Sequence, residues 1–357
     1  MAASSMRVGI LNDMSEGPPD LTDMERWLRV AVDDLVDGGR LDRGVEFVHS
    51  WGLGLPSGTA AAVERAYADL VDQDVLLIVG PAIGDNALVA TPLAERYGVP
   101  TINWAGTERA RSTFMFHLQV GSHEDESIVL ARWLSSIGAR RVGLVQDRSP
   151  IGRRYAQFLQ AEADVLGLRI ATVASVGPLA EDAGEQVGQV LDAGPDSLVY
   201  LGLGLAAPAV ARALSARDWD GPRAMNTAGM RGYSPEFGRT IDGWVYVDME
   251  SDRNTTLAAL RARLNLSPDL SPATEYGAAR GYDLSRLVAE GLARAPERTR
   301  EGVKDGLEQV KWLSAAEGHD GTLLGFGHHD RGALHGRYLV LRRWQGGRSV
   351  ELVEAGA

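Results

Sequence analysis

The sequence predicts an α/β fold with two lobes, each a doubly wound parallel sheet covered by helices on both faces. Short apolar segments typical of strands alternate with amphipathic segments typical of helices, which is the pattern of βαβ units. The alternation pauses over residues 116–127, FHLQVGSHEDES, and starts again at residue 140. A chain of 357 residues with 45% hydrophobic residues is long enough for two domains, each with its own core.

In the first half, apolar residues define both the strands and the faces of the helices. Met24, Trp27, Leu28, Ala31 and Leu35 recur at helical spacing, and Gly38 and Gly39 end that helix. The predicted strands are 7–11, 45–48, 76–79 and 101–104, with further helices around Val63–Leu70 and over DNALVATPLAERYG.

The second half repeats this rhythm and ends differently. Strands are predicted at 140–147, 169–176, 197–203, 223–229 and 243–250, followed by a helix over 273–295. Two final strands, 336–344 and 348–355, are joined by a QGG turn and predict a hairpin. Because no linker rich in Pro, Gly and Ser separates the halves, we expect short crossings between them.

Composition excludes several classes of function. The net charge of −12 argues against direct nucleic-acid binding, which needs a basic surface. The absence of cysteine excludes disulfides, thiolate metal sites and cysteine nucleophiles. No apolar run approaches the roughly 18–20 residues of a membrane span. The N-terminus lacks an export-signal pattern, so the protein is cytoplasmic if its native start is Met1 or Met6, and otherwise exported with the signal removed.

The stretch VGPAIGDN, residues 79–86, is typical of a binding loop between a strand and a helix. A helix N-terminus presents unpaired N–H groups and a partial positive charge, which favour an anionic or polar guest. The alternative is that Asp85 or Asn86 simply caps the helix.

The motifs of catalysis and of cofactors are weak. GLGLAA, residues 202–207, fits a dinucleotide fingerprint, but it lies mid-chain and the acids after it, Asp218 and Asp220, lie in a predicted loop. A metal site could be formed by His328, Asp330 and His335. The pattern favours a solvated loop over that metal site. We therefore predict no catalytic residue, no cofactor and no metal, with an NAD-dependent enzyme as a remote alternative.

Six segments, in this order and spacing, carry a family resemblance: VGILNDMSEGP (8–18), AAAVERAYADLVDQDVLLIVGP (60–81), AERYGVPTINWAGT (94–107), RRVGLVQDRSPIGRRYAQFLQAEADVLG (140–167), YGAARGYDLSRLVAEGLARA (276–295) and RYLVLRRWQGGRSVELV (337–353). The chain resembles the type I periplasmic binding proteins, in the leucine/isoleucine/valine-binding family that also includes amide sensors.

The resemblance implies two lobes joined by three hinge crossings, with the ligand in the cleft between them. Guests of open parallel sheets lie beyond the carboxyl ends of the strands, which agrees with this expectation. We place the crossings near 118–124, 248–252 and 327–333. Lobe 1 is then 6–119 plus 251–328, and lobe 2 is 120–250 plus 329–357.

The resemblance also implies a set of ligand-binding residues, of which those in the loop at Ala105–Thr107 match the family well. Gly84, Asp85 and Asn86 stand where serines are usual. The expected contacts are Asp13, Met14, Leu21, Gly84, Asp85, Asn86, Ala105, Gly106 and Thr107 in lobe 1, and Ser149, Ile151, Gly204 and Ala228 in lobe 2.

Lobe 2 departs from the family pattern in ways that bear on the ligand. Ile151 and Gly204 replace aromatic residues, and Ala228 replaces the acid that pairs with an α-ammonium group. Burying an unpaired ammonium costs several kcal/mol, so a standard amino acid is an unfavourable ligand. We expect a neutral amide or a carboxylic acid without an amino group. Asp85 favours the amide if it faces the pocket, and leaves room for the acid if it caps the helix.

The resemblance implies a non-catalytic binding protein, the substrate-binding component of a branched-chain-amino-acid-type ABC importer. The alternative is a cytoplasmic ligand sensor of the amide-sensor type. The expected partners are a small organic ligand and either an ABC permease or a regulatory protein, and a homodimer is left open.

Overall fold

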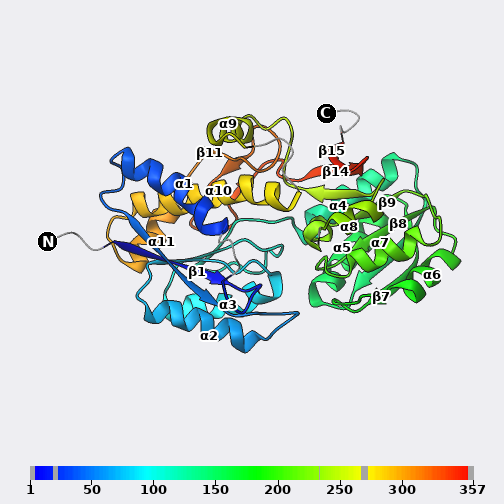
Figure 1. The fold of residues 1–357 in the computed structure, drawn as a ribbon, viewed down its shortest axis with the longest axis horizontal. Coiled ribbons are helices and arrows are strands. Elements are labelled where there is room, and N and C mark those ends of the chain that lie inside the picture. Colours follow the sequence, from blue (N-terminus) through cyan, green and yellow to red (C-terminus); the bar gives the residue numbers. More distant parts are fainter. Residues whose placement is uncertain (1–4, 19–22, 233, 267–271, 353–357) are drawn as a thin grey trace. The chain divides into compact units, whose positions relative to one another are not determined.

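The computed structural model describes residues 5–18, 23–232, 234–266 and 272–352 (Figure 1). The chain forms two compact units, with unit 1 comprising Met1–Val120 and Arg253–Tyr338, and unit 2 comprising Gly121–Asp252 and Leu339–Ala357. It therefore passes from one unit to the other three times, and the α/β fold class predicted from the sequence is confirmed.

Unit 1 is built on a five-stranded parallel sheet in the order β2-β1-β3-β4-β5. Helices α2 and α3 cover one face, and α1, α10 and α11 cover the other (Figure 1). The strands are β1 (Met6–Asn12), β2 (Val45–Trp51), β3 (Leu77–Val79), β4 (Thr101–Asn103) and β5 (Met115–His117). The helices are α1 (Asp23–Asp37), α2 (Ala60–Asp72), α3 (Gly84–Tyr97), α9 (Thr255–Leu264), α10 (Pro272–Arg294) and α11 (Arg300–Glu308).

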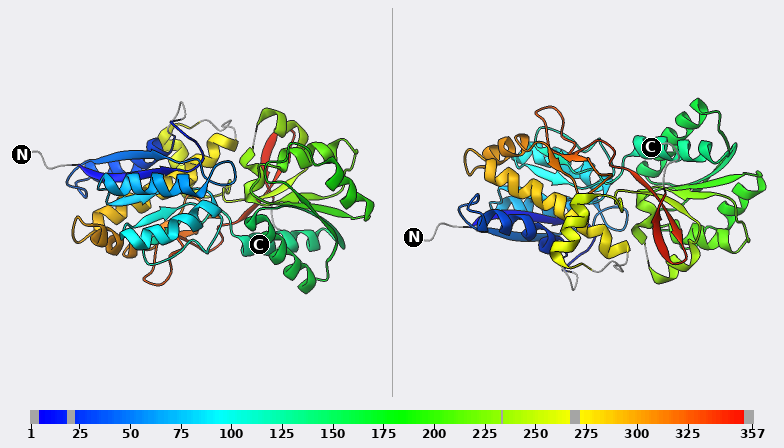
Figure 2. Two further views of the ribbon diagram at one scale, coloured as in Figure 1. Left: turned by 90° about the horizontal axis from the view of Figure 1, so that it is seen from below. Right: turned by 90° about the horizontal axis from the view of Figure 1, so that it is seen from above.

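Unit 2 is built on a seven-stranded sheet in the order β15-β14-β10-β9-β8-β6-β7. The predicted terminal hairpin is confirmed, because β14 pairs antiparallel with both β15 and β10 (Figure 2, red strands). The strands are β6 (Arg141–Asp147), β7 (Arg169–Val176), β8 (Ser197–Leu201), β9 (Arg223–Met225), β10 (Val245–Asp248), β14 (Val340–Gln345) and β15 (Arg348–Glu351). The helices are α4 (His123–Ser136), α5 (Pro150–Val165), α6 (Gly184–Asp192), α7 (Ala207–Ser215), the 3-10 helix η1 (Thr227–Gly232) and α8 (Pro235–Thr240).

Some predicted elements differ from the observed ones. The pause predicted over 116–127 contains the end of β5 and the start of α4, which Ser122 caps by accepting a hydrogen bond from the Asp125 amide. The strand predicted over 223–229 ends at Met225, and η1 begins at Thr227. A small antiparallel sheet of β11 (Leu313–Ser314), β12 (Leu323–Leu324) and β13 (Leu334–His335) was not predicted, because two-residue strands have no readable alternation.

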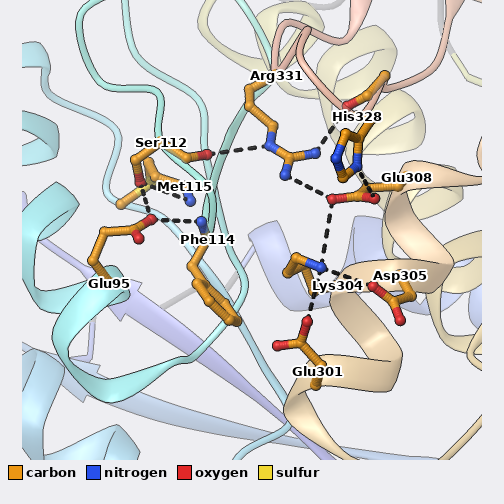
Figure 3. Close-up of polar contacts among 11 residues, drawn as sticks. Glu95, Ser112, Phe114, Met115, Glu301, Lys304, Asp305, Glu308, His328 and Arg331 are labelled. Atoms are coloured by element: carbon orange, nitrogen blue, oxygen red, sulfur yellow. Dashed lines mark hydrogen bonds and ion pairs between the residues drawn. The ribbon is translucent and has the colours of Figure 1, made fainter.

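Residues 327–338 lie in unit 1, whereas the sequence predicted the third crossing at 327–333. The Arg331 side chain anchors this segment by donating to the Ser112 carbonyl (3.2 Å) and to the Glu308 carboxylate (2.7 Å) (Figure 3). The Arg331 carbonyl also accepts a hydrogen bond from the His117 amide of β5 (2.8 Å). These contacts hold the segment to unit 1, and the third crossing follows Tyr338.

The two units share a six-residue pattern at their first strands. Val8–Asp13 reads VGILND and Val142–Asp147 reads VGLVQD. A Cβ on Gly9 would lie 3.1 Å from Leu70 of α2, and one on Gly143 would lie 2.4 Å from Val190 of α6. Both glycines therefore let the helix between the second and third strands of their unit pack close to the sheet.

No helix in the described parts of the chain combines the length and the apolar character that crossing a membrane requires.

Candidate functional site

Each sheet has one point at which the strand order reverses, and the predicted binding loops lie there. In unit 1, β1 lies between β2 and β3, so the carboxyl ends of β1 and β3 flank the reversal. In unit 2, β6 and β8 hold the same positions. Crevices at such switch points are where open α/β sheets bind their ligands.

Asp13, at the end of β1, spans the switch point of unit 1. Its carboxylate accepts hydrogen bonds from the backbone amides of Ala82 (2.9 Å) and Ile83 (3.0 Å), which follow β3. It also accepts from the Asn86 side-chain amide (2.8 Å), and Asp13 is 1% exposed. Asp13 thus holds the loop in place, and two amides of VGPAIGDN are already bonded within the protein.

The start of α3 has no side-chain cap, because Ile83 is the N-cap residue. The alternative that Asp85 or Asn86 caps the helix is wrong, since both lie inside its first turn. The Asn86 side chain pairs with the Leu55 amide (2.8 Å) as well as with Asp13. A Cβ on Gly54 would lie 2.3 Å from Asn86, so glycine is required for this close approach. Gly84 and Asp85 are buried in the same turn.

The second predicted loop, Ala105–Thr107, follows β4 and is shaped by two buried side chains. Asn103 donates to the carbonyls of Ala110 (2.9 Å) and Phe116 (2.8 Å). Arg111 donates to His117 Nδ1 (3.0 Å), so His117 Nε2 carries the proton and donates to the Ala105 carbonyl (2.7 Å). Thr107 is 1% exposed, and Gly106 is half-buried.

Two further residues of unit 1 were predicted to contact the ligand. Met14 directly follows Asp13 and is 49% exposed, which is unusual for a large apolar side chain. Leu21 lies outside the described residues.

Asp147 repeats the role of Asp13 at the switch point of unit 2. One carboxylate oxygen accepts from the Leu203 amide (2.6 Å), which follows β8, and the other accepts from Ser149. Ser149 in turn caps α5 by accepting from the Gly152 amide (2.9 Å). Asp147 is 0% exposed, and it organises these two loops from within the protein.

The GLGLAA loop is held from its other side by Asn226, which follows β9. The Asn226 side chain accepts from the Gly202 amide (3.2 Å) and donates to the Gly202 carbonyl (2.8 Å). Gly204 adopts φ +89°, which favours glycine. Helix α7 then begins at Ala207 after Ala206, and neither α7 nor α3 has a side-chain cap.

The remaining predicted residues of unit 2 differ in exposure. Ile151 is buried in the first turn of α5, whereas Ala228 in η1 is half-buried. Ser149 thus contacts Asp147 directly, Gly204 follows Leu203, whose amide bonds to Asp147, and Ala228 lies two residues beyond Asn226.

Glu126 of α4 is a buried acid beside Ala228 that sequence reasoning missed. Its carboxylate accepts from the amides of Thr227 (2.6 Å) and Ser122 (2.9 Å) and from the Tyr155 hydroxyl (2.6 Å). Burial raises the pKa of Glu126 to about 7, although these hydrogen bonds oppose the rise.

The supporting residues Asp147 and Asn226 were also missed. The repeat of VGILND in VGLVQD would have pointed to Asp147, because it gives Asp13 a counterpart. For Asn226, His117 and Glu126, no local pattern separates a supporting side chain from an ordinary polar residue.

No cluster of three metal-ligating side chains occurs in the described ranges. His328 contacts Glu308 (3.0 Å), and His335 contacts the Gly325 carbonyl (3.0 Å), so the two histidines serve separate local contacts. The candidate site, in the residues that the structure describes, presents backbone amides and small side chains supported by buried carboxylates.

Solved structures with the same fold cover nearly the whole chain. A periplasmic binding protein type 1 from Bordetella pertussis Tohama I has a TM-score of 0.82 and 16% identity, covering 98% of this chain and 100% of its own. A leucine-binding protein from Thermotoga maritima has a TM-score of 0.80 and 15% identity, covering 98% of each chain. The isoleucine complex of a branched-chain amino acid transporter substrate-binding protein from Streptococcus pneumoniae has a TM-score of 0.79 and 18% identity, covering 98% of this chain and 99% of its own.

No curated protein sequence matches the chain. The sequence model of the family described as periplasmic binding protein matches residues 5–340, which is almost the full length. The chain therefore belongs to the periplasmic binding protein family, and its fold is that of the type I members.

Proposed function

We propose that this protein is the ligand-binding component of an ABC importer and that its two units close around one small organic molecule. The observation that carries the proposal is the matched construction of the two switch points. In each unit a strand-end aspartate, Asp13 or Asp147, holds the loop that precedes a helix without a side-chain cap. Family members are typically exported, and we propose the same for this chain.

The proposed ligand carries a polar head and no ammonium group. In unit 1 the head is met by the first turn of α3 and by Thr107, whose hydroxyl can both donate and accept. In unit 2, Ala228 supplies no counter-charge, and the Glu126 carboxylate already accepts three hydrogen bonds from within the protein. Ile151 and Gly204 leave an apolar wall for an aliphatic or ring-containing body. A neutral amide fits this description better than a carboxylic acid without an amino group, because Asp85 does not hold the N-cap position of α3.

Thr107→Ala tests whether the proposed site binds the ligand. A ligand at a hundredfold excess over Kd stabilises the folded state by about 2.7 kcal/mol, which a melting curve detects. We expect 4-methylpentanamide or 4-methylpentanoic acid to raise the melting temperature of the wild type, and Thr107→Ala to lose most of that rise. The exposed Thr113→Ala is the matched control and should keep it. Equal rises in all three proteins would place the ligand elsewhere.

A further inference from the structure

Glu126 joins three separate segments of unit 2 through one carboxylate. One oxygen, Oε1, accepts from the Ser122 amide, where the chain has just entered the unit, and from the Tyr155 hydroxyl of α5. The other oxygen, Oε2, accepts from the Thr227 amide, next to Ala228. The backbone around Glu126 is fitted to it, because a Cβ on Gly121 would lie 1.9 Å from Oε1.

Hydrogen bonds are the main interactions that stabilise the Glu126 carboxylate, as the groups around it show. From its own helix, His123 packs on the Tyr155 ring with centroids 4.4 Å apart. From the segment after β10, Met249 accepts from the Gly121 amide (3.0 Å), and Asp248 accepts from the Met249 amide. Within the described parts of unit 2, Glu126 itself has no ion pair with a basic side chain.

The charge of Glu126 determines how firmly it holds these segments. Hydrogen bonds to an ionised carboxylate are shorter and roughly twice as strong as those to a neutral group. The Thr227 amide lies 2.6 Å from Oε2, within reach of such a bond. The pKa of about 7 means that the charge is present above neutrality and lost below it.

We propose that Glu126 is a positioning residue of the ligand site. Its carboxylate fixes the Thr227–Ala228 segment, and losing the charge loosens that segment and weakens ligand binding. Only the last step, the effect on the ligand, rests on the proposed function.

Hydrogen exchange at pH 6 and pH 8 tests the positioning role without any ligand. After correction for intrinsic rates, we expect peptides covering residues 226–230 to exchange about tenfold faster at pH 6, the equivalent of one pKa unit. Glu126→Gln should show the fast rate at both pH values. The exposed Glu124→Gln, on the same helix, should behave like the wild type.

A change in global stability alone would act in the opposite direction. Because the pKa of Glu126 is raised in the folded protein, protonation stabilises the fold, and global opening would slow at pH 6. Exchange that is slower at pH 6, or equal at both pH values in the wild type, overturns the proposal. The exchange rates of the wild type at the two pH values decide between these outcomes even if Glu126→Gln fails to fold.

Calorimetric titration with 4-methylpentanamide, which does not ionise in this range, tests the effect on the ligand. We expect the Kd of the wild type to be several-fold larger at pH 6 than at pH 8. The Kd of Glu126→Gln should not depend on pH. A pH-independent Kd in the wild type, together with pH-dependent exchange, overturns the link to ligand binding. If neither 4-methylpentanamide nor 4-methylpentanoic acid binds at either pH, the proposed function fails, while the exchange result still decides the positioning role.

Discussion

At the scale of single residues, buried carboxylates organise the candidate site from beneath. Asp13 and Asp147 each turn a loop amide inward, so that the backbone, and not the acid, forms the surface of the loop. Burying a charge in this way is tolerable because each carboxylate accepts several hydrogen bonds. Their substitution should therefore affect folding as well as binding.

Asp147→Asn should destabilise the protein by about 1–3 kcal/mol, the cost of a buried donor left unsatisfied. Asparagine has one acceptor oxygen, whereas Asp147 serves Leu203 on one oxygen and Ser149 on the other. A urea denaturation curve measures the loss. Asp164→Asn, exposed on α5, is the control, and equal midpoints for the two variants would refute the supporting role.

Glu126→Gln should change how stability depends on pH. Since burial raises the folded-state pKa of Glu126 from 4.5 to about 7, its stabilising contribution is complete below 4.5 and lost as pH rises through 7. The variant cannot ionise, so its free energy of unfolding relative to wild type should increase by up to about 3 kcal/mol between pH 5 and pH 8. Parallel stability profiles would show that Glu126 does not titrate in this range.

At the scale of secondary-structure elements, the segment between β12 and β13 is tied into unit 1 by charged side chains. Arg331 is 6% exposed and lies over the Phe116 ring at 4.5 Å, while it pairs with Glu308 of α11 (Figure 3). Burial alone would raise the pKa of Glu308, but His328, Arg331 and Lys304 lower it overall. This contribution to stability is present above pH 4.5 and is lost as pH falls through the lowered pKa.

Arg331→Ala should cost about 1.5–3 kcal/mol, because the Glu308 carboxylate loses its charge-assisted hydrogen bond from Arg331. Thermal unfolding should show a lower melting temperature than the exposed control Arg65→Ala on α2. A loss no larger than that of the control would mean that Lys304 and His328 compensate for Arg331.

Elements with strong periodicity could be predicted from the sequence, and short ones could not. The β7 strand was predicted with its observed bounds, because its residues are flanked by clear turn signals. In contrast, β5, β11, β12 and β13 have two or three residues each, which is too few to show a periodicity in the sequence. Pairing with a neighbouring strand defines them, and hydrophobic alternation alone does not reveal that pairing.

At the scale of the whole molecule, the two units share one arrangement of strands and helices. The repeated strand–helix pattern in the two halves of the sequence predicts this. The first strand of each unit carries the same six-residue pattern, which ends at an aspartate of the switch point, and the third strand is followed by a helix that has no side-chain cap. The positions of the loops at the two switch points could be predicted from the sequence, because strand ends and glycines mark them. The residues beneath the loops were not, because burial and hydrogen bonding across strands decide their roles.

The central claim is that this pair of loops binds a polar head group without an ammonium. Isothermal titration calorimetry with leucine, 4-methylpentanoic acid and 4-methylpentanamide tests it directly, since the three share one aliphatic body and differ only in the head. We predict saturable binding of the amide or of the acid, with leucine at least about a hundredfold weaker, because an unpaired ammonium costs several kcal/mol to bury. Tight binding of leucine by the unmodified protein would contradict the account.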